Sequence, residues 1–587
     1  MTLLRTIYTL IILSLSVTLH AQKETTIRII QTSDVHGSIF PFDYINNEAV
    51  DYGLAHVLTY VNNLRENENQ EVILLDNGDI LQGQPTVYYA NYIDTVNKHI
   101  VPEVMNYMGY EASTVGNHDI EAGPENYNQI EKEFEFPWLS ANIIDKRTGL
   151  TYFKPYTIIE RNGVKIAVMG LTTPSVPNWL SPKLWEHMQF NDMIESASQW
   201  MDSIRINEKP HIIIGLFHAG HDASYEGSDP DEPFNENASA LVAQQVPGFD
   251  AVLIGHDHSR VLKKIVNNKG DSVLLADPGA KAQFVSDITI RITLDANNNV
   301  VNKDIDGSLA SMQGLMPSPQ LVGKFSKFTQ EVENYVDRKI GEITETICTR
   351  DAYFGPSTFV NLIHDVQLGV SNVNISFAAP LSFDAVIEKG EIYIRDMFNL
   401  YSYENLLYIM KLTGKEVRDY LEYSYGLWLN TMQTKNDNLL LFRENESGNT
   451  LINDNGRALL QSSYYNFDSA SGILYTVDVS KPKGERITII SMEDGSDFSL
   501  DAEYNVAINS YRGTGGGGHL TEGAGISKDE LQDRIINVSS QGMRHFLIRW
   551  IERTGRISPK KKNNWEIIPK KWAEKAAERD RKLLFGE

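Results

Sequence analysis

The sequence is poor in cysteine and in positive charge, and both shortages restrict what the protein can be. Its 587 residues include a single cysteine, Cys348, so a disulfide within the chain and a cysteine-based metal site are excluded. With 53 Lys and Arg against 77 Asp and Glu, the formal net charge is -24. This acidity argues against binding of polymeric nucleic acid. It does not exclude small anionic substrates, because a metal site supplies local positive charge.

No apolar run beyond the N-terminus is long enough to span a membrane. The N-terminus itself carries Arg5, an apolar run from about Ile7 to Leu19, and then Ala21. That run is short for a span, which needs ~20 apolar residues. The pattern is typical of a secretory signal peptide cleaved near Ala21–Gln22. We therefore expect an exported protein, periplasmic or secreted, with no stable membrane anchor, and we expect a monomer.

Patterning predicts several parts along the chain. From about residue 25 to 310, short apolar runs such as "TIRIIQT" and "HIIIGLFH" alternate with helix-capable stretches, which predicts an α/β layered domain. Apolar residues then recur at spacings of three and four from Leu321 to Val336, which predicts an amphipathic connecting helix. The expected divisions are a signal peptide (1–21), an N-terminal domain (22–312), a linker helix (313–341), a C-terminal α+β domain (342–556) and a solvated charged helical tail (557–587).

Five apolar runs are followed by residue types that bind metal ions. In chain order these are Asp34 and His36, Asp79, Asn117 and His118, His218 and His221, and His256 and His258. Ligands of α/β sheets bind outside the carboxyl ends of the strands, so we expect these side chains to converge. Nitrogen and oxygen donors without thiolate favour two divalent ions such as Mn, Zn or Fe, with the Asp79 carboxylate as a bridge. Two such ions clamp the attacking and leaving oxygens of an in-line displacement and make hydroxide available at neutral pH.

The stretch "TVGNHDIEAG", residues 114–123, adds a proton-transfer group to these ligands. Asn117 is expected as a neutral ligand and His118 as an unligated imidazole that donates a proton to the leaving oxygen. Glu121, one helical turn on, is expected to orient that imidazole. The alternative is that Asp119 and Glu121 only favour the start of a helix electrostatically.

The joint D-x-H, G-D, G-N-H, H and G-H-x-H segments resemble the calcineurin-like metallophosphoesterases. More narrowly, they are similar to exported 5'-nucleotidases and 2',3'-cyclic-nucleotide 2'-phosphodiesterases, from about residue 25 to 556. The resemblance implies a four-layer β-sandwich flanked by helices, which holds a dinuclear metal centre and does the chemistry, and a C-terminal α+β nucleotide-recognition domain. It implies that one ion is held by Asp34, His36, Asp79 and His258, and the second by Asp79, Asn117, His218 and His256. His118 falls in the catalytic histidine position of the family.

The second domain carries the base-binding part of the resemblance. Its segments "SYYNFDSASGILYTVDVSKPKGERI" and "NSYRGTGGGGH" are similar to those that hold a base between two aromatic rings. Tyr511 is one candidate ring, since stacking on an aromatic tolerates any base; the other is Tyr465 or Phe467, and the pattern does not decide between them. Glycines permit close backbone approach, so the substrate-binding candidates also include Gly515, Gly516 and Gly517.

Two departures from the 5'-nucleotidase pattern favour the cyclic phosphodiesterase branch. The segment "SFAAPLSFD", residues 376–384, lacks the phosphate-binding Arg of 5'-nucleotidases, and Gly517 stands where they carry a ribose-contacting Asp. The resemblance thus implies hydrolysis of 2',3'-cyclic nucleotides and 3'-nucleotides to nucleoside and phosphate, by attack of metal-bound hydroxide. The alternatives are a 5'-nucleotidase or nucleotide-sugar hydrolase, a sulfur-ester hydrolase on the same scaffold, and a secreted binding protein that has lost catalysis.

Overall fold

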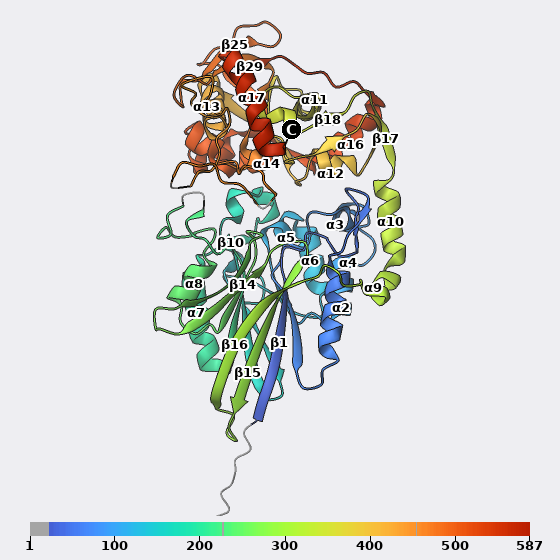
Figure 1. Ribbon diagram of the computed structural model, residues 1–587, viewed down its shortest axis with the longest axis vertical. Coiled ribbons are helices and arrows are strands. Elements are labelled where there is room, and N and C mark those ends of the chain that lie inside the picture. The colour runs from blue at the N-terminus through green and yellow to red at the C-terminus, as the bar shows by residue number, and fades with distance from the viewer. Residues whose placement is uncertain (1–22, 226–227, 446, 454, 587) are drawn as a thin grey trace, which may run out of the picture.

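The computed structural model describes residues 23–225, 228–445, 447–453 and 455–586. The chain folds into two parts stacked along the long axis of the molecule, and α10 runs up one side between them (Figure 1). The predicted signal peptide, residues 1–21, lies outside the described residues. In the described ranges no helix is both long and apolar enough to cross a membrane.

The N-terminal part contains two six-stranded sheets. The first has the strand order β16 (Val300–Ser311), β15 (Phe284–Leu294), β1 (Lys23–Thr32), β4 (Glu71–Asp76), β5 (Ala112–Thr114) and β6 (Trp138–Leu139). The second has the order β13 (Arg260–Val266), β14 (Ser272–Pro278), β12 (Ala251–Ile254), β11 (Ile212–His218), β9 (Val164–Thr172) and β8 (Tyr156–Arg161). Strands β1, β4 and β5 are parallel to one another, as are β9, β11, β12 and β14.

The two sheets pack face to face, and helices cover their outer faces. Ile27 and Ile29 of β1 share a buried cluster with Ile214 of β11, so this cluster lies between the sheets. Ile30 faces the other way, into a cluster with the helices over the first sheet: α2 (Leu54–Arg65), α3 (Pro85–Tyr92), α4 (Ile100–Met108), α5 (Asn117–Glu121) and α6 (Pro124–Glu133). Helices α7 (Met193–Asn207) and α8 (Ser239–Gln245) cover the second sheet. The strands are thus buried on both faces, which explains why they appear in the sequence as continuous apolar runs. The predicted four-layer α/β fold is confirmed.

The stretch predicted as one connecting helix consists of two helices, α9 (Pro319–Lys324) and α10 (Ser326–Val336). Phe325 separates them with non-helical backbone angles and packs with Leu321 into the core of the first sheet. Val332 of α10 is buried in a small separate cluster. The apolar stripe is therefore buried as its periodicity indicates, but on two different surfaces, and the chain bends between them.

The C-terminal part is built around a five-stranded sheet with the order β23 (Ser469–Ser471), β19 (Ile375–Ala378), β26 (Glu503–Asn509), β22 (Leu406–Thr413) and β27 (Ile535–Gly542). Its helices are α11 (Thr358–Ser371), α12 (Asp396–Leu400), α13 (Gly414–Trp428), α14 (Ser510–Gly513), α15 (Lys528–Arg534), α16 (Met543–Thr554) and α17 (Lys570–Phe585). It also has two three-stranded sheets: β21 (Gly390–Tyr393), β17 (Lys339–Ile343) and β28 (Arg556–Ile557), and β25 (Ile487–Met492), β24 (Ile473–Asp478) and β29 (Trp565–Ile568). Strands β18 (Ile347–Cys348) and β20 (Val386–Ile387) form a further two-stranded sheet. The predicted α+β character is confirmed.

The interpretation of residues 557–587 as a solvated tail is wrong. Strand β29 pairs with β24, and α17 packs into the core of the C-terminal part through Ala576 and Leu584, both fully buried. The charged side chains of α17 lie mainly on its other face. Asp580 is the exception: it is buried, and its carboxylate accepts hydrogen bonds from the main-chain N–H groups of Leu439 and Leu440 at 2.8 and 2.9 Å. The high charge content of this segment masked the fact that its apolar and small residues lie on one face of the helix.

Candidate active site

The predicted metal ligands meet at one edge of the two sheets. Asp34 and His36 follow β1, Asp79 follows β4, Asn117 opens α5 directly after β5, His218 ends β11, and His256 and His258 follow β12. Because the two sets of parallel strands point the same way, their carboxyl ends bring loops from both sheets together. The structure therefore assembles all seven side chains in one place.

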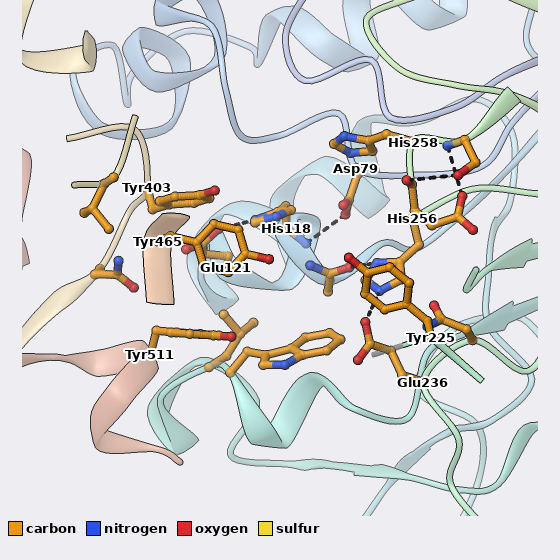
Figure 2. Close-up of a pocket in the computed structure, with 18 of the residues that line it drawn as sticks. Asp79, His118, Glu121, Tyr225, Glu236, His256, His258, Tyr403, Tyr465 and Tyr511 are labelled. Carbon is orange, nitrogen blue, oxygen red and sulfur yellow. Dashed lines mark hydrogen bonds and ion pairs between the residues drawn. The ribbon is translucent and has the colours of Figure 1, made fainter. Parts of the chain in front are cut away.

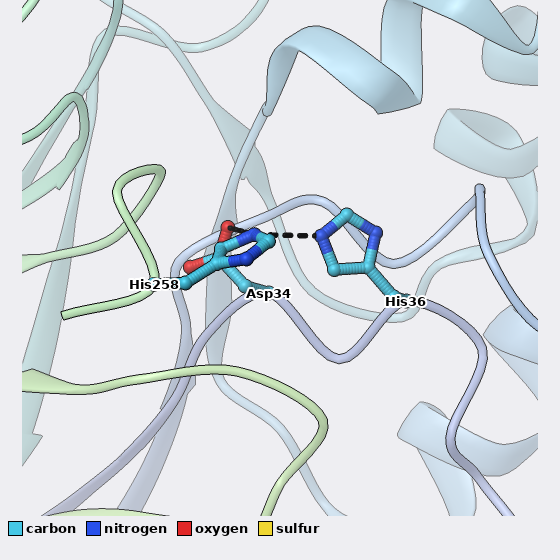
Figure 3. A group of neighbouring side chains, drawn as sticks. All are labelled: Asp34, His36 and His258. Carbon is cyan, nitrogen blue, oxygen red and sulfur yellow. Dashed lines mark hydrogen bonds and ion pairs between the residues drawn. The ribbon is translucent and has the colours of Figure 1, made fainter. Parts of the chain in front are cut away.

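The ligand atoms form two groups, within each of which all ligand atoms lie within 4.8 Å of one another. One group is Asp34, His36 and His258 (Figure 3), in which the two imidazole Nε2 atoms are 3.0 Å apart. The other is Asp79, His218 and His256.

Asn117 completes the second group. Its Oδ1 lies 2.9 Å from His256 Nδ1 and 3.1 Å from His218 Nε2. The Oδ2 atom of Asp79 is 3.2 Å from His218 Nε2. Oxygen and nitrogen donors from these residues thus surround one point.

The donor set fits cations. His36 Nδ1 donates to the carbonyl of Gln82 and His218 Nδ1 donates to the carbonyl of Asn77, so in the neutral form of each ring the Nε2 atom presents its lone pair to the site. These lone pairs face other nitrogens and carboxylate oxygens, an arrangement that repels unless positive charge lies between them. Both groups combine imidazole nitrogens with a carboxylate, a donor set suited to hold two divalent ions, as the resemblance implies.

Five of the seven ligand candidates have left-handed backbone conformations. The φ angles of Asp34, His36, Asp79, His256 and His258 lie between 48° and 87°. Non-glycine residues rarely adopt this region, and such strain concentrates at functional sites. The strand-to-loop turns therefore direct these side chains inward at a cost in backbone energy, which the sequence pattern did not reveal.

The Asp119 carboxylate connects the loop after β4 to the loop after β5 by hydrogen bonds. Its Oδ2 accepts N–H bonds from Asp79 and Gly116 at 3.0 and 2.8 Å, and its Oδ1 accepts them from Ile80 and Leu81 at 3.0 and 3.1 Å. The carboxylate is fully buried. It therefore does more than favour a helix start: it fixes the position of Asp79 relative to the turn that carries Asn117.

His118 lies beside the ligands with its ring bound elsewhere. Its Nδ1 contacts Glu121 Oε2 at 2.5 Å, and its main-chain N–H donates to Asp79 Oδ1 at 2.8 Å. Burial disfavours the imidazolium, but the negative charges of Asp79 and Glu121 outweigh this and raise the pKa of His118 to about 9. The geometry suits an imidazole that carries a proton while Glu121 holds its orientation.

A cavity of about 520 Å³ connects this centre to the C-terminal part. Figure 2 shows Tyr403, Tyr465 and Tyr511 at one end and Asp79 and His258 at the other, with His118 and Glu121 between them. Among the described residues that line the cavity, none is a lysine or an arginine.

The structure separates the two aromatic candidates that the sequence left open. Tyr465 lines the cavity, whereas Phe467 is buried in the core and stacks on Trp428 at 5.2 Å between ring centroids. Tyr511 lines the cavity as predicted. The short helix η5 (Tyr464–Asn466) turns the chain between positions 465 and 467, so their side chains point to different places.

The predicted glycines, Gly515, Gly516 and Gly517, are not among the residues that line the cavity. A Cβ atom on Gly516 would lie 2.6 Å from the Tyr511 ring, and one on Gly517 would lie 2.2 Å from Arg512 Nη1. The missing side chains at positions 516 and 517 thus leave room for Tyr511 and Arg512.

Arg512 links the two segments that carry the tyrosines. Its buried guanidinium pairs with Asp468 at 2.6 Å and donates to the carbonyl of Tyr465 at 2.6 Å. It also donates to the carbonyl of Gly516 at 3.1 Å. Arg512 is therefore occupied within the protein and fixes the positions of both rings, so it does not replace the missing phosphate-binding arginine.

Sequence patterns missed other residues of the cavity, including Trp179 and Glu236. His221, which the patterns did mark, also lines the cavity, but its Nδ1 contacts the carboxylate of Asp257 at 2.9 Å and it belongs to neither ligand group. Trp179 follows η1 (Val176–Asn178), in the loop that leaves β9. Because β9 is parallel to β11, this loop starts at the same edge of the sheet as His218. The position of Trp179 after an apolar run was therefore the sequence signal that could have identified it. No comparable pattern marked Glu236.

Comparisons with known proteins agree with this arrangement. Residues 27–260 match the family of calcineurin-like phosphoesterases, and residues 339–522 match the 5'-nucleotidase C-terminal domain. The trifunctional nucleotide phosphoesterase YfkN of Bacillus subtilis is 28% identical over 94% of this chain, which spans only 39% of that longer relative. The 2',3'-cyclic-nucleotide 2'-phosphodiesterase/3'-nucleotidase of Salmonella typhimurium is 26% identical, with 92% of this chain and 89% of the relative covered.

Among solved structures, the 5'-nucleotidase precursor of Thermus thermophilus superposes with a TM-score of 0.62 at 20% identity, covering 93% of this chain and 99% of that one. A 5'-nucleotidase candidate from Staphylococcus aureus superposes with a TM-score of 0.75 at 20% identity, covering 92% and 100%. Together, the fold, the two ligand groups and the two family matches identify a calcineurin-like phosphoesterase domain over residues 27–260, followed by a 5'-nucleotidase C-terminal domain over residues 339–522.

Proposed function

We propose that the protein is an exported, metal-dependent phosphoesterase that converts 2',3'-cyclic nucleotides and 3'-nucleotides to nucleoside and phosphate. The observation that carries the proposal is the shared cavity onto which members of both metal-ligand groups open, opposite two tyrosines from another part of the chain. Relatives named for these activities support it.

Each part of the cavity has a role in the proposed reaction. Two divalent ions, when bound, would supply positive charge for the phosphoryl group and lower the pKa of water. Asp34, His36, Asp79 and His258 would hold one ion, and Asp79, Asn117, His218 and His256 the other. His118 donates a proton to the leaving ribose oxygen, and Glu121 keeps its Nδ1 fixed. Tyr465 and Tyr511 hold the base.

The charge of the cavity favours the cyclic substrate. The lining includes Glu121, Asp222, Glu236 and Asp257 but no lysine or arginine among the described residues. In the segment that lacks the family's arginine, Leu381 is the residue that reaches the cavity. A cyclic phosphodiester carries one negative charge and needs less positive clamping than a phosphomonoester, which carries nearly two.

The test compares turnover of 2',3'-cyclic AMP, 3'-AMP and 5'-AMP at one Mn²⁺ concentration. Phosphate release is measured, with a downstream phosphatase added in the cyclic assay to report the opened product. Asp79→Asn protein purified in parallel measures contaminating activity. We expect kcat/KM for the cyclic and 3' substrates to exceed that for 5'-AMP.

A preference for 5'-AMP would instead identify a 5'-nucleotidase, the second candidate, and would mean that the missing arginine is compensated elsewhere. UDP-glucose is included in the assay because nucleotide-sugar hydrolysis belongs to the same alternative. Two bound ions with no turnover of any of these substrates would support the noncatalytic binding protein.

Export is a separate part of the proposal and rests on the N-terminal pattern around Arg5 and Ala21. It is tested by determining the N-terminus of the protein produced in its own host. A mature chain that begins near Gln22 supports export. A chain that retains Met1 in the cell extract contradicts it.

A further inference from the structure

The outer nitrogens of the ligand imidazoles have different partners. In His36 and His218 the nitrogen that points away from the site donates to a main-chain carbonyl. In His256 the corresponding atom, Nε2, lies 3.0 Å from the carboxylate Oε1 of Glu236. Since a carboxylate only accepts hydrogen bonds, this contact favours a proton on Nε2. The Nδ1 atom lies 2.9 Å from Asn117 Oδ1, which also only accepts, so with a metal ion bound the lone pairs of both atoms would be directed at that ion.

Hydrogen bonds made by Glu236 and by the residue before it hold this segment of the chain in place. The carbonyl of Glu236 accepts a hydrogen bond from the Thr173 hydroxyl at 3.0 Å, which ties it to the loop after β9. The Asn235 side chain donates to the carbonyl of Ala223 and accepts from the N–H of Asn237, both at 2.9 Å. Glu236 is therefore held in a constrained segment at the wall of the cavity.

The face of the His256 ring is constrained as well. The indole of Trp179 stacks on it with 5.5 Å between ring centroids and 24° between planes. A contact at the ring edge and another on the ring face together fix how the imidazole is turned. Figure 2 shows Glu236 next to His256, on the side away from His118.

The two ligand groups also differ in negative charge. Asp34 belongs to one group alone, whereas the other group contains Asp79, the carboxylate expected to bridge both ions. The second group is thus short of one negative charge relative to the first. The carboxylate of Glu236 is hydrogen-bonded to His256, a ligand of that group. It therefore adds the missing negative charge without itself being a metal ligand.

We propose that Glu236 is a positioning residue for His256 and raises the affinity of the metal site formed by Asp79, Asn117, His218 and His256. This inference rests on the proposed metal centre. A carboxylate that accepts the outer N–H of a ligand imidazole fixes its tautomer and increases its basicity, and loss of such a partner typically costs 10–100-fold in metal affinity.

The experiment measures Mn²⁺ binding to metal-stripped protein by calorimetric titration, for the wild type, Glu236→Gln and Glu236→Ala. We expect two ions per chain in the wild type. In Glu236→Ala one of the two dissociation constants should rise about 10–100-fold while the other stays unchanged. Glu236→Gln, which keeps an acceptor oxygen but loses the charge, should show a smaller rise. Raising Mn²⁺ should restore turnover of Glu236→Ala, which a folding defect would not allow.

Asp222→Ala is the matched control. Asp222 lines the same cavity, and its carboxylate accepts hydrogen bonds from the main chain and hydroxyl of Ser224. Its loss should leave both dissociation constants unchanged. An equal weakening in Asp222→Ala would show that only the overall charge of the cavity matters, and unchanged binding in Glu236→Ala would also overturn the inference. Failure of the wild type to bind two ions would instead refute the proposed metal centre, so the two failures are distinguishable.

Discussion

At the scale of single residues, His118 is the group whose loss separates chemistry from metal binding. Its Nδ1 is bound to Glu121, and its main-chain N–H donates to Asp79. We expect His118→Ala to lower kcat by roughly 10²–10⁴-fold, the usual contribution of a positioned proton donor. Metal analysis should still give two ions per chain.

The control for this prediction is Asp79→Ala, which should lose both ions because its carboxylate is expected to bridge them. If His118→Ala protein loses metal, His118 is a ligand and its catalytic assignment is wrong.

Tyr465 and Phe467 are two residues apart and test the assignment of the base site. Tyr465→Ala should raise KM for nucleotides, since base stacking contributes about 1–3 kcal/mol, and should leave turnover of bis(4-nitrophenyl) phosphate unchanged. Phe467→Leu should lower the melting temperature through lost packing on Trp428 and leave KM unchanged. The reverse pattern in steady-state kinetics would place Phe467, not Tyr465, at the base.

At the scale of elements, the glycine-rich loop after α14 acts through the side chain next to it. Gly516→Ala should displace the Tyr511 ring, because the added Cβ would lie 2.6 Å from it. We expect a higher KM for nucleotides with unchanged metal content. Gly323→Ala, in α9 with nothing within 4 Å of its Cβ position among the described residues, serves as the control and should leave KM unchanged. Equal KM values for Gly516→Ala and wild type would refute the support role of the loop.

The same loop shows where sequence reasoning stops. A run of glycines beside an aromatic residue correctly predicts a site where other atoms approach the backbone closely. It does not identify which atoms these are. Here the side chains that approach the glycines are those of Tyr511 and Arg512. Helix α17 shows a related limit: its many charges predicted solvation, whereas small and apolar residues on one face bury it.

At the scale of the whole molecule, buried neutral histidines make stability depend on pH. Burial lowers the pKa of His99, His364 and His519 to about 3. Below the ordinary value of about 6.5 the unfolded chain takes up protons at these positions and the folded chain does not. The free energy of unfolding should therefore fall as pH decreases from about 6.5 towards 3, by at most about 1.4 kcal/mol per pH unit for each histidine.

Urea unfolding at pH 7 and pH 5, with EDTA present, measures this dependence. His364→Gln keeps an amide for the hydroxyls of Ser376 and Ser469 but does not titrate, so its loss of stability between the two pH values should be smaller. The exposed His187, changed to Gln, is the control. A pH dependence equal to that of wild type would mean that His364 does not contribute.

Much of the fold and of the metal site could be predicted from the sequence, for a physical reason. Parallel strands buried on both faces appear as apolar runs, and ligands at their carboxyl ends appear as short motifs at fixed places after those runs. The left-handed backbone of residues such as Asp34 and the contact between Glu236 and His256 depend on loops that meet only after folding. The ligand roles and the domain divisions stay predictions.

The cavity joins groups from two parts of the chain, metal ligands from the sheets and tyrosines from the C-terminal part. In the language of multivalency, the proposed nucleotide substrate is a bivalent ligand whose phosphate and base would each bind one half, with the ribose as a short tether that makes the second contact intramolecular. Hydrolysis of the 3'-nucleotide, unlike opening of the cyclic ester, cuts that tether. The products are then two monovalent ligands without mutual reinforcement, so the reaction itself promotes their release.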